Sequence, residues 1–159
     1  MKLKGLIAED FCNYKLPSMF LITSQCDWKC CTEQGLDIGV CQNSPLAQQK
    51  TKEISNEAIY QAYINNPITK AIVVSGLEPM LQYEELFDLI SYFRLNGCDD
   101  EFIIYTGYYP EELPELSTLK MFKNIIVKFG RFVPNQKPHY DEVLGVNLAS
   151  NNQYAKKIS

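Results

Sequence analysis

The chain has 159 residues, a formal net charge of −4, and 46% hydrophobic and 12% aromatic residues. This length and apolar content suit a single domain over residues 1–159, and the acidic balance, without a stripe of Lys and Arg, excludes a nucleic-acid-binding surface. The start of the chain has too short an apolar run for a signal peptide, and no stretch could span a bilayer. We therefore expect a cytoplasmic protein with no membrane contact.

The predicted elements alternate between strands and helices. Residues 18–24 form a short apolar run that is typical of a strand, and a cysteine-containing loop follows it. Residues 51–67 have apolar side chains at helical spacing, with Ser55 as the N-cap and Pro67 beyond the end. The continuous apolar run over residues 70–76 predicts a strand buried on both faces.

The second half of the chain continues this alternation. Residues 83–97 repeat the helical period and stop at Asn-Gly, residues 100–108 and 122–132 predict two more strands, and residues 110–116 predict a short helix or turn. Such an order favours right-handed βαβ units, and therefore an α/β fold with a mostly parallel sheet. Because ligands bind at the carboxyl ends of parallel strands, we expect one site built from the loops that follow the four strands.

The first of these loops is rich in cysteine, with Cys26, Cys30, Cys31 and Cys41. In a reducing compartment, clustered cysteines bind metal more often than they form disulfides, and thiolates select zinc or iron–sulfur clusters. The adjacent pair is awkward as two joint ligands, and leaving one of them out gives three. Three thiolates on a four-iron cluster leave one iron open to chemistry. A four-cysteine zinc site and simple burial of small apolar side chains are the alternatives.

The same residues resemble a known family. Cys26, Cys30 and the stretch "CQNSP" look like the cluster motif of radical S-adenosylmethionine proteins. The stretches "SGLEPML", "IIYTGYYPEEL", "IIVKFGRFV" and "LASNNQ" follow in the family's order. The chain is most similar to the small activases of anaerobic ribonucleoside-triphosphate reductase, over nearly its whole length. The resemblance implies a single-domain partial (βα) barrel that binds a 4Fe-4S cluster.

The resemblance also implies the ligands of the cluster, which would be Cys26, Cys30 and Cys41. The family has two residues between its second and third cysteines, whereas ten separate Cys30 from Cys41 here. Cys31 is therefore a possible alternative third ligand. We favour Cys41 because an Asn and a Pro follow it closely, as they follow the last cysteine of the family motif.

S-adenosylmethionine is the second cofactor that the resemblance implies. It would bind at the stretches after the second and third predicted strands: Ser75, Gly76, Leu77, Glu78, Thr106, Gly107 and Tyr108. An open iron would chelate it, and one electron from the reduced cluster would give methionine and a 5′-deoxyadenosyl radical, so no catalytic residue beyond the cluster is expected. Leu77 stands where the family has a second glycine, and Phe129 stands where it has an aspartate.

The implied function is that of an activase, an enzyme that forms a glycyl radical on a partner enzyme such as anaerobic ribonucleotide reductase. An electron donor such as flavodoxin would reduce the cluster. The chain has no obvious second domain for a small-molecule substrate, which favours a protein substrate. The long spacing to Cys41 and the presence of Leu77 support a different interpretation, a non-catalytic iron–sulfur or zinc-binding module on the same scaffold.

Overall fold

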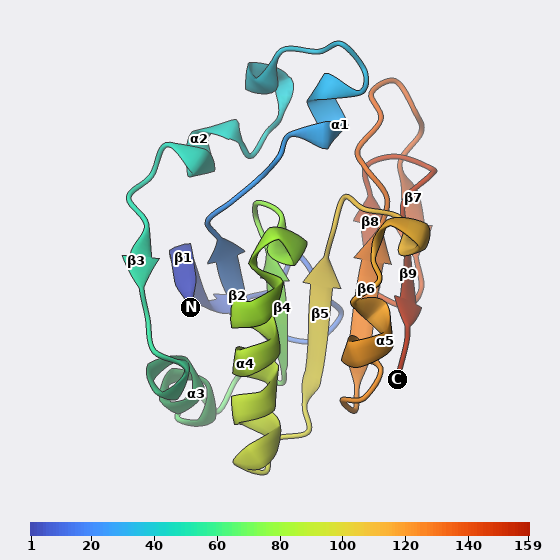
Figure 1. The fold of residues 1–159 in the computed structure, drawn as a ribbon. Coiled ribbons are helices and arrows are strands. Elements are labelled where there is room, and N and C mark those ends of the chain that lie inside the picture. Colours follow the sequence, from blue (N-terminus) through green and yellow to red (C-terminus); the bar gives the residue numbers. More distant parts are fainter.

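The computed structural model describes all residues 1–159 and is built around a seven-stranded sheet of order β3-β1-β2-β4-β5-β6-β9 (Figure 1). Its four central strands are parallel: β2 (Ser18–Thr23), β4 (Ala71–Ser75), β5 (Glu101–Tyr105) and β6 (Ile125–Phe129). The flanking strands are antiparallel to their neighbours: β1 (Lys2–Asp10), β3 (Lys52–Glu53) and β9 (Tyr154–Lys157). The predicted α/β fold with a mostly parallel sheet is confirmed. The sheet is open, and its curvature into a partial barrel stays a prediction.

The helices begin and end at the signals in the sequence. In α3 (Asn56–Ile64), the Ser55 hydroxyl accepts a hydrogen bond from the Ala58 amide at 3.1 Å, as the predicted N-cap should. Helix α4 (Tyr83–Leu95) ends before Gly97, which has a φ of 80°. The predicted short helix or turn becomes two pieces, η3 (Pro110–Glu112) and α5 (Leu116–Leu119), while η2 (Pro79–Gln82) leads into α4.

Several elements were not predicted. These are β1, β3, β9 and a separate hairpin of β7 (His139–Asp141) and β8 (Val146–Leu148). The cysteine segment, predicted as a loop, contains three short turns of helix: α1 (Lys29–Thr32), η1 (Ile38–Val40) and α2 (Ser44–Ala47). Apart from β1, which lies between β3 and β2, all of these are short or lie at an edge of the sheet, so packing and pairing rather than local pattern decide them.

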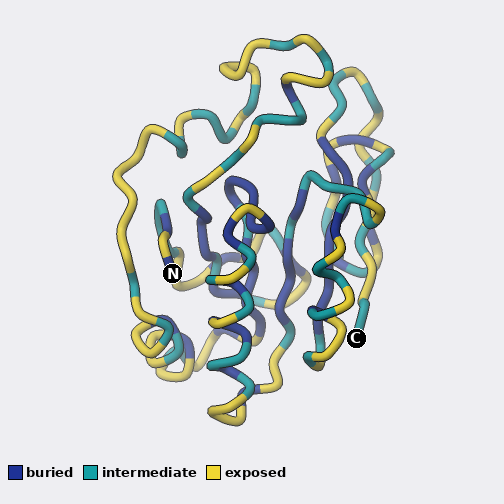
Figure 2. The backbone as a smooth tube through the Cα atoms, in the orientation of Figure 1, coloured by how far each residue is buried: buried dark blue, intermediate teal, exposed yellow.

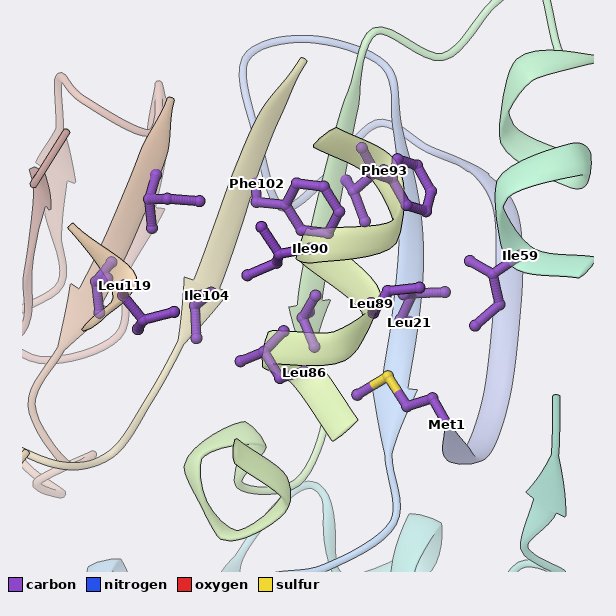
Figure 3. Close-up of a cluster of buried hydrophobic side chains, with 14 of the residues drawn as sticks. Met1, Leu21, Ile59, Leu86, Leu89, Ile90, Phe93, Phe102, Ile104 and Leu119 are labelled. Carbon is purple, nitrogen blue, oxygen red and sulfur yellow. The ribbon is translucent and has the colours of Figure 1, made fainter. Parts of the chain in front are cut away.

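The larger core lies between the sheet and α4. Figure 3 shows Leu86, Leu89, Ile90 and Phe93 on this helix, packed beside side chains of the central strands. The rings of Phe93 and Phe102 meet edge to face with centroids 5.2 Å apart. A smaller apolar cluster covers the opposite face, where Tyr14, Leu144 and Leu148 pack on β4, β5 and β6. Burial on both faces explains why these strands read as continuous apolar runs.

The cysteine segment runs across the carboxyl ends of the parallel strands, from β2 through α1 and α2 to β3 (Figure 1). Most of it is exposed or half-buried, in contrast to the buried strands beneath (Figure 2). The predicted loops after β4, β5 and β6 lie at this same carboxyl edge of the sheet. None of the helices combines the length and apolar composition that crossing a bilayer would need.

Candidate metal centre

The turn after β4 depends on a glycine. Gly76 has a φ of 92°, and a Cβ on it would stand 2.5 Å from Cγ2 of Ile22 on β2. Glycine alone meets both demands, because it adopts positive φ without strain and has no side chain to collide. The turn then brings the Glu78 amide to the carbonyl of Gln25, at 2.7 Å. This hydrogen bond joins the loop after β4 to the start of the cysteine segment.

Glu78 links the two stretches that were predicted to bind S-adenosylmethionine. Its side chain is only 6% exposed. Its Oε1 accepts a hydrogen bond from Thr106 Oγ1 at 2.7 Å, and its Oε2 accepts one from the Gly107 amide at 2.8 Å. Burial raises the pKa of Glu78, and these hydrogen bonds oppose that shift by stabilising the carboxylate. The predicted residues therefore meet at one place, although Thr106 is buried by this contact.

A small pocket of about 40 Å³ lies between Glu78 and the cysteines. Its lining comes from three loops: Cys26, Asp27, Lys29 and Cys30, then Glu78, and then Gly107, Tyr108 and Arg131. Cys41 is half-buried like Cys26 and Cys30 but does not line the pocket, and negative charge on it is one of the smaller causes that raise the pKa of both of those thiols. Burial is the larger cause and raises the pKa of Cys26 to about 11.

Cys31 differs from the other three because it is buried, with 3% of its surface exposed. Its Sγ lies 3.8 Å from that of Cys30, and its backbone carbonyl accepts hydrogen bonds from the amides of Gln34 and Leu36. This placement agrees with a packing role, while the choice between Cys31 and Cys41 as third ligand stays a prediction.

The thiols are not gathered around a single point. No three side chains of Cys, His, Asp or Glu are arranged to hold one metal ion. A four-iron cluster carries its thiolates on different irons, so its ligands stand farther apart than those of a single zinc ion. Three half-buried sulfur donors, Cys26, Cys30 and Cys41, two of them lining one pocket, fit the donor chemistry of an iron–sulfur cluster.

A charged network that was not predicted fastens the cysteine segment over the pocket. The Arg131 guanidinium binds Glu112 with both terminal nitrogens, and its Nε lies 2.9 Å from Glu33 Oε2. Lys29 Nζ lies 3.4 Å from Glu112 Oε1. We expected residues 110–116 to form a short helix or turn, and the sequence offered no sign that Glu112 would pair with two cations from other loops.

Tyr108 adds a second fastening. Its hydroxyl donates a hydrogen bond to Asp27 Oδ2 at 2.6 Å, and Lys29 Nζ lies 4.4 Å from the centre of its ring. The predicted cofactor-binding tyrosine therefore contacts the cysteine segment in this structure. Gln34 completes the connection by donating from Nε2 to the carbonyl of Phe132 at 2.9 Å.

The stretch "LASNNQ" supports the loop after β6. Gln153 donates to the Gly130 carbonyl at 3.3 Å, and Asn152 donates to the Arg131 carbonyl at 2.8 Å. Gly130 has a φ of 94°, and a Cβ on it would stand 2.9 Å from the Asn152 carbonyl oxygen. These two side chains therefore position the loop that carries Arg131. They reach it because β9, the strand that follows them, pairs with β6.

Residues 18–154 match the model of a family described as the 4Fe-4S single cluster domain. The chain belongs to this family. The match includes the four clustered cysteines and all four loops at the carboxyl edge, so the iron–sulfur part of the prediction is supported. Comparisons with curated proteins and with solved structures found no match.

Proposed function

We propose that the chain is a radical S-adenosylmethionine activase that uses its 4Fe-4S cluster to form a glycyl radical on a partner enzyme. The partner would be a glycyl radical enzyme such as anaerobic ribonucleotide reductase, and a donor such as flavodoxin would supply the electron. The observation that carries this proposal is the shared pocket, which Cys26 and Cys30 line together with Glu78 and Tyr108 from the predicted S-adenosylmethionine stretches.

The proposal assigns separate tasks to the cluster and to the chain. Bound and reduced, the cluster supplies the electron that divides S-adenosylmethionine into methionine and a 5′-deoxyadenosyl radical. Cys26, Cys30 and Cys41 would hold the cluster. The backbone at residues 75–78 would receive the amino group of the methionine part, beside the Glu78 carboxylate. The loop of Thr106, Gly107 and Tyr108 would lie along the nucleoside and exclude water.

The size of the pocket sets a requirement for this function. Binding sites for ligands of the size of S-adenosylmethionine commonly have volumes of several hundred Å³, whereas this pocket has about 40 Å³. S-adenosylmethionine would therefore need the cysteine segment to move away from Tyr108 and Glu112. Surface ion pairs and single hydrogen bonds contribute about 1 kcal/mol each, so ligand binding can offset the loss of these fastenings.

The test begins with anaerobic reconstitution by iron and sulfide. Addition of S-adenosylmethionine to the dithionite-reduced protein should change the electron paramagnetic resonance spectrum, because a new chelating ligand enters the first shell of the open iron. Methionine and 5′-deoxyadenosine should then form in equal amounts. Cys26→Ala is the control that removes a proposed ligand, and it should give neither signal.

Two observations favour a second candidate, a non-catalytic iron–sulfur module. Leu77 is buried at 8% exposure where the resembled family has glycine, and the pocket is small. An unchanged spectrum in a protein that has taken up iron and sulfide would support this module and contradict the activase. Metal analysis showing zinc alone would contradict both.

A further inference from the structure

Lys128 is a nearly buried cation to which the proposed function assigns no role. Lys128 lies on β6, with only 6% of its surface exposed. Its neighbours on the strand, Val127 and Phe129, point into the apolar core, so Lys128 faces the opposite side of the sheet. A buried ammonium group is costly unless charges or hydrogen bonds compensate it.

The ammonium group of Lys128 reaches toward the carboxyl edge of the sheet. Its Nζ donates to the Gly130 carbonyl at 2.7 Å, in the loop after β6. That is its single hydrogen bond within the chain, although an ammonium group has three N–H donors. It forms no ion pair with any carboxylate. Two donors of a nearly buried cation are thus left without a protein acceptor.

The hydrogen bond to Gly130 places the ammonium group of Lys128 beside the candidate metal centre. Burial lowers the pKa of Lys128 to about 8, and negative charge on Glu78 and Cys30 acts in the opposite direction. Both of these residues line the pocket beneath the cysteine segment. The Gly130 amide in turn donates to the carbonyl of Tyr108 at 3.1 Å, and Tyr108 and Arg131, the residue after Gly130, line the same pocket as Cys26 and Cys30.

We propose that Lys128 is the counter-charge of the cluster site and raises the reduction potential of the cluster bound there. A cluster on thiolates carries net negative charge, and reduction adds one electron to it. A fixed positive charge in a low-dielectric surrounding favours the reduced form, because Coulomb interactions are strong there. Lys128 would then act only through its positive charge, without touching the substrate or the irons. This inference rests on the proposed cluster site but not on cleavage of S-adenosylmethionine.

The experiment measures the midpoint potential of the reconstituted cluster by dithionite titration, followed by electron paramagnetic resonance. Lys128→Met removes the charge and keeps much of the side chain's length. Lys128→Arg keeps the charge, and Lys156→Met removes an exposed lysine from β9 as a matched control. We expect a clearly more negative potential in K128M, with K128R and K156M close to the parent protein.

The outcomes separate this inference from the proposed function. Equal potentials in K128M, K156M and the parent protein, all holding the cluster, would overturn the counter-charge role. Should K128M fail to hold a cluster, Lys128→Gln is compared with K128R, with circular dichroism to verify folding. If K128R holds the cluster and K128M and K128Q do not, the charge of Lys128 is required. If all three variants lose the cluster, the counter-charge role is overturned in favour of a packing role. A parent protein that takes up no iron would end the proposed function and this inference together.

Discussion

Arg131 binds Glu112 through two parallel hydrogen bonds, one of them 2.8 Å from Nη1 to Oε2. The two residues belong to the loops after β6 and β5, and Arg131 also contacts Glu33 in the cysteine segment. Such bidentate pairs are more specific in geometry than single contacts. The arrangement fastens three loops together at the edge of the sheet where the metal centre is proposed.

The first prediction concerns the ligands of the cluster. Cys26→Ala, Cys30→Ala and Cys41→Ala should each abolish uptake of iron and sulfide, because each removes a thiolate that the remaining residues cannot replace. Cys31→Ala should retain the cluster, since that thiol is buried in packing. Iron and sulfide analysis after reconstitution measures the result. Retention in the Cys41 variant with loss in the Cys31 variant would reverse the assignment.

The second prediction concerns acid stability. Hydrogen bonding to Arg131 lowers the pKa of Glu112 from 4.5 to about 2. A lowered pKa in the folded state stabilises the fold above pH 4.5, and this contribution is lost as the pH falls toward 2. Glu112→Gln should be less stable than the parent at pH 7 and should lose less stability between pH 4.5 and 2.

Urea unfolding at several pH values measures this difference. Glu111→Gln is the matched control, because Glu111 is an exposed neighbour on the same turn. Parallel stability curves for E112Q and the parent protein across this window would show that the Arg131 pair contributes nothing to acid sensitivity.

The third prediction concerns the turn after β4. Gly76→Ala imposes a positive φ on alanine and places its Cβ 2.5 Å from Ile22. Gly97→Ala imposes a similar φ, but no atom lies within 4 Å of its Cβ. Positive φ costs about 1–2 kcal/mol, and overpacking adds about 1–3 kcal/mol. Thermal or urea unfolding should therefore show a greater loss for G76A, and equal losses would mean that the contact with Ile22 relaxes freely.

The fourth prediction concerns the carboxylate that joins two loops. Glu78→Gln keeps the shape but has one acceptor oxygen where the carboxylate has two, so the backbone amide of either Met80 or Gly107 meets an amide N–H₂ instead. The free energy of unfolding should fall by about 1–3 kcal/mol. Glu142→Gln, at an exposed position, should have almost no effect. An E78Q variant as stable as the parent protein would show that these hydrogen bonds contribute nothing to the free energy of unfolding.

Local signals in the sequence were sufficient for the central strands and the two main helices. The apolar run at Ala71–Ser75 and the Ser55 cap are properties of a few neighbouring residues, and the structure confirms both. Parallel order then placed all the unusual loops at one edge, since carboxyl ends of parallel strands coincide. The sequence alone therefore predicts that the cysteines, Glu78 and Tyr108 belong to one site.

Tertiary structure alone decided how that site is held. The edge strands β3 and β9 pair with β1 and β6, so they depend on partners far along the chain. The same holds for side chains: the pairing of Arg131 with Glu112, and the buried ammonium of Lys128, join groups that no short pattern connects. The periodicity of a sequence indicates which face of a helix or strand a residue occupies. The charged or hydrogen-bonding partner of that residue comes from another segment of the chain, which lies beside it only after folding.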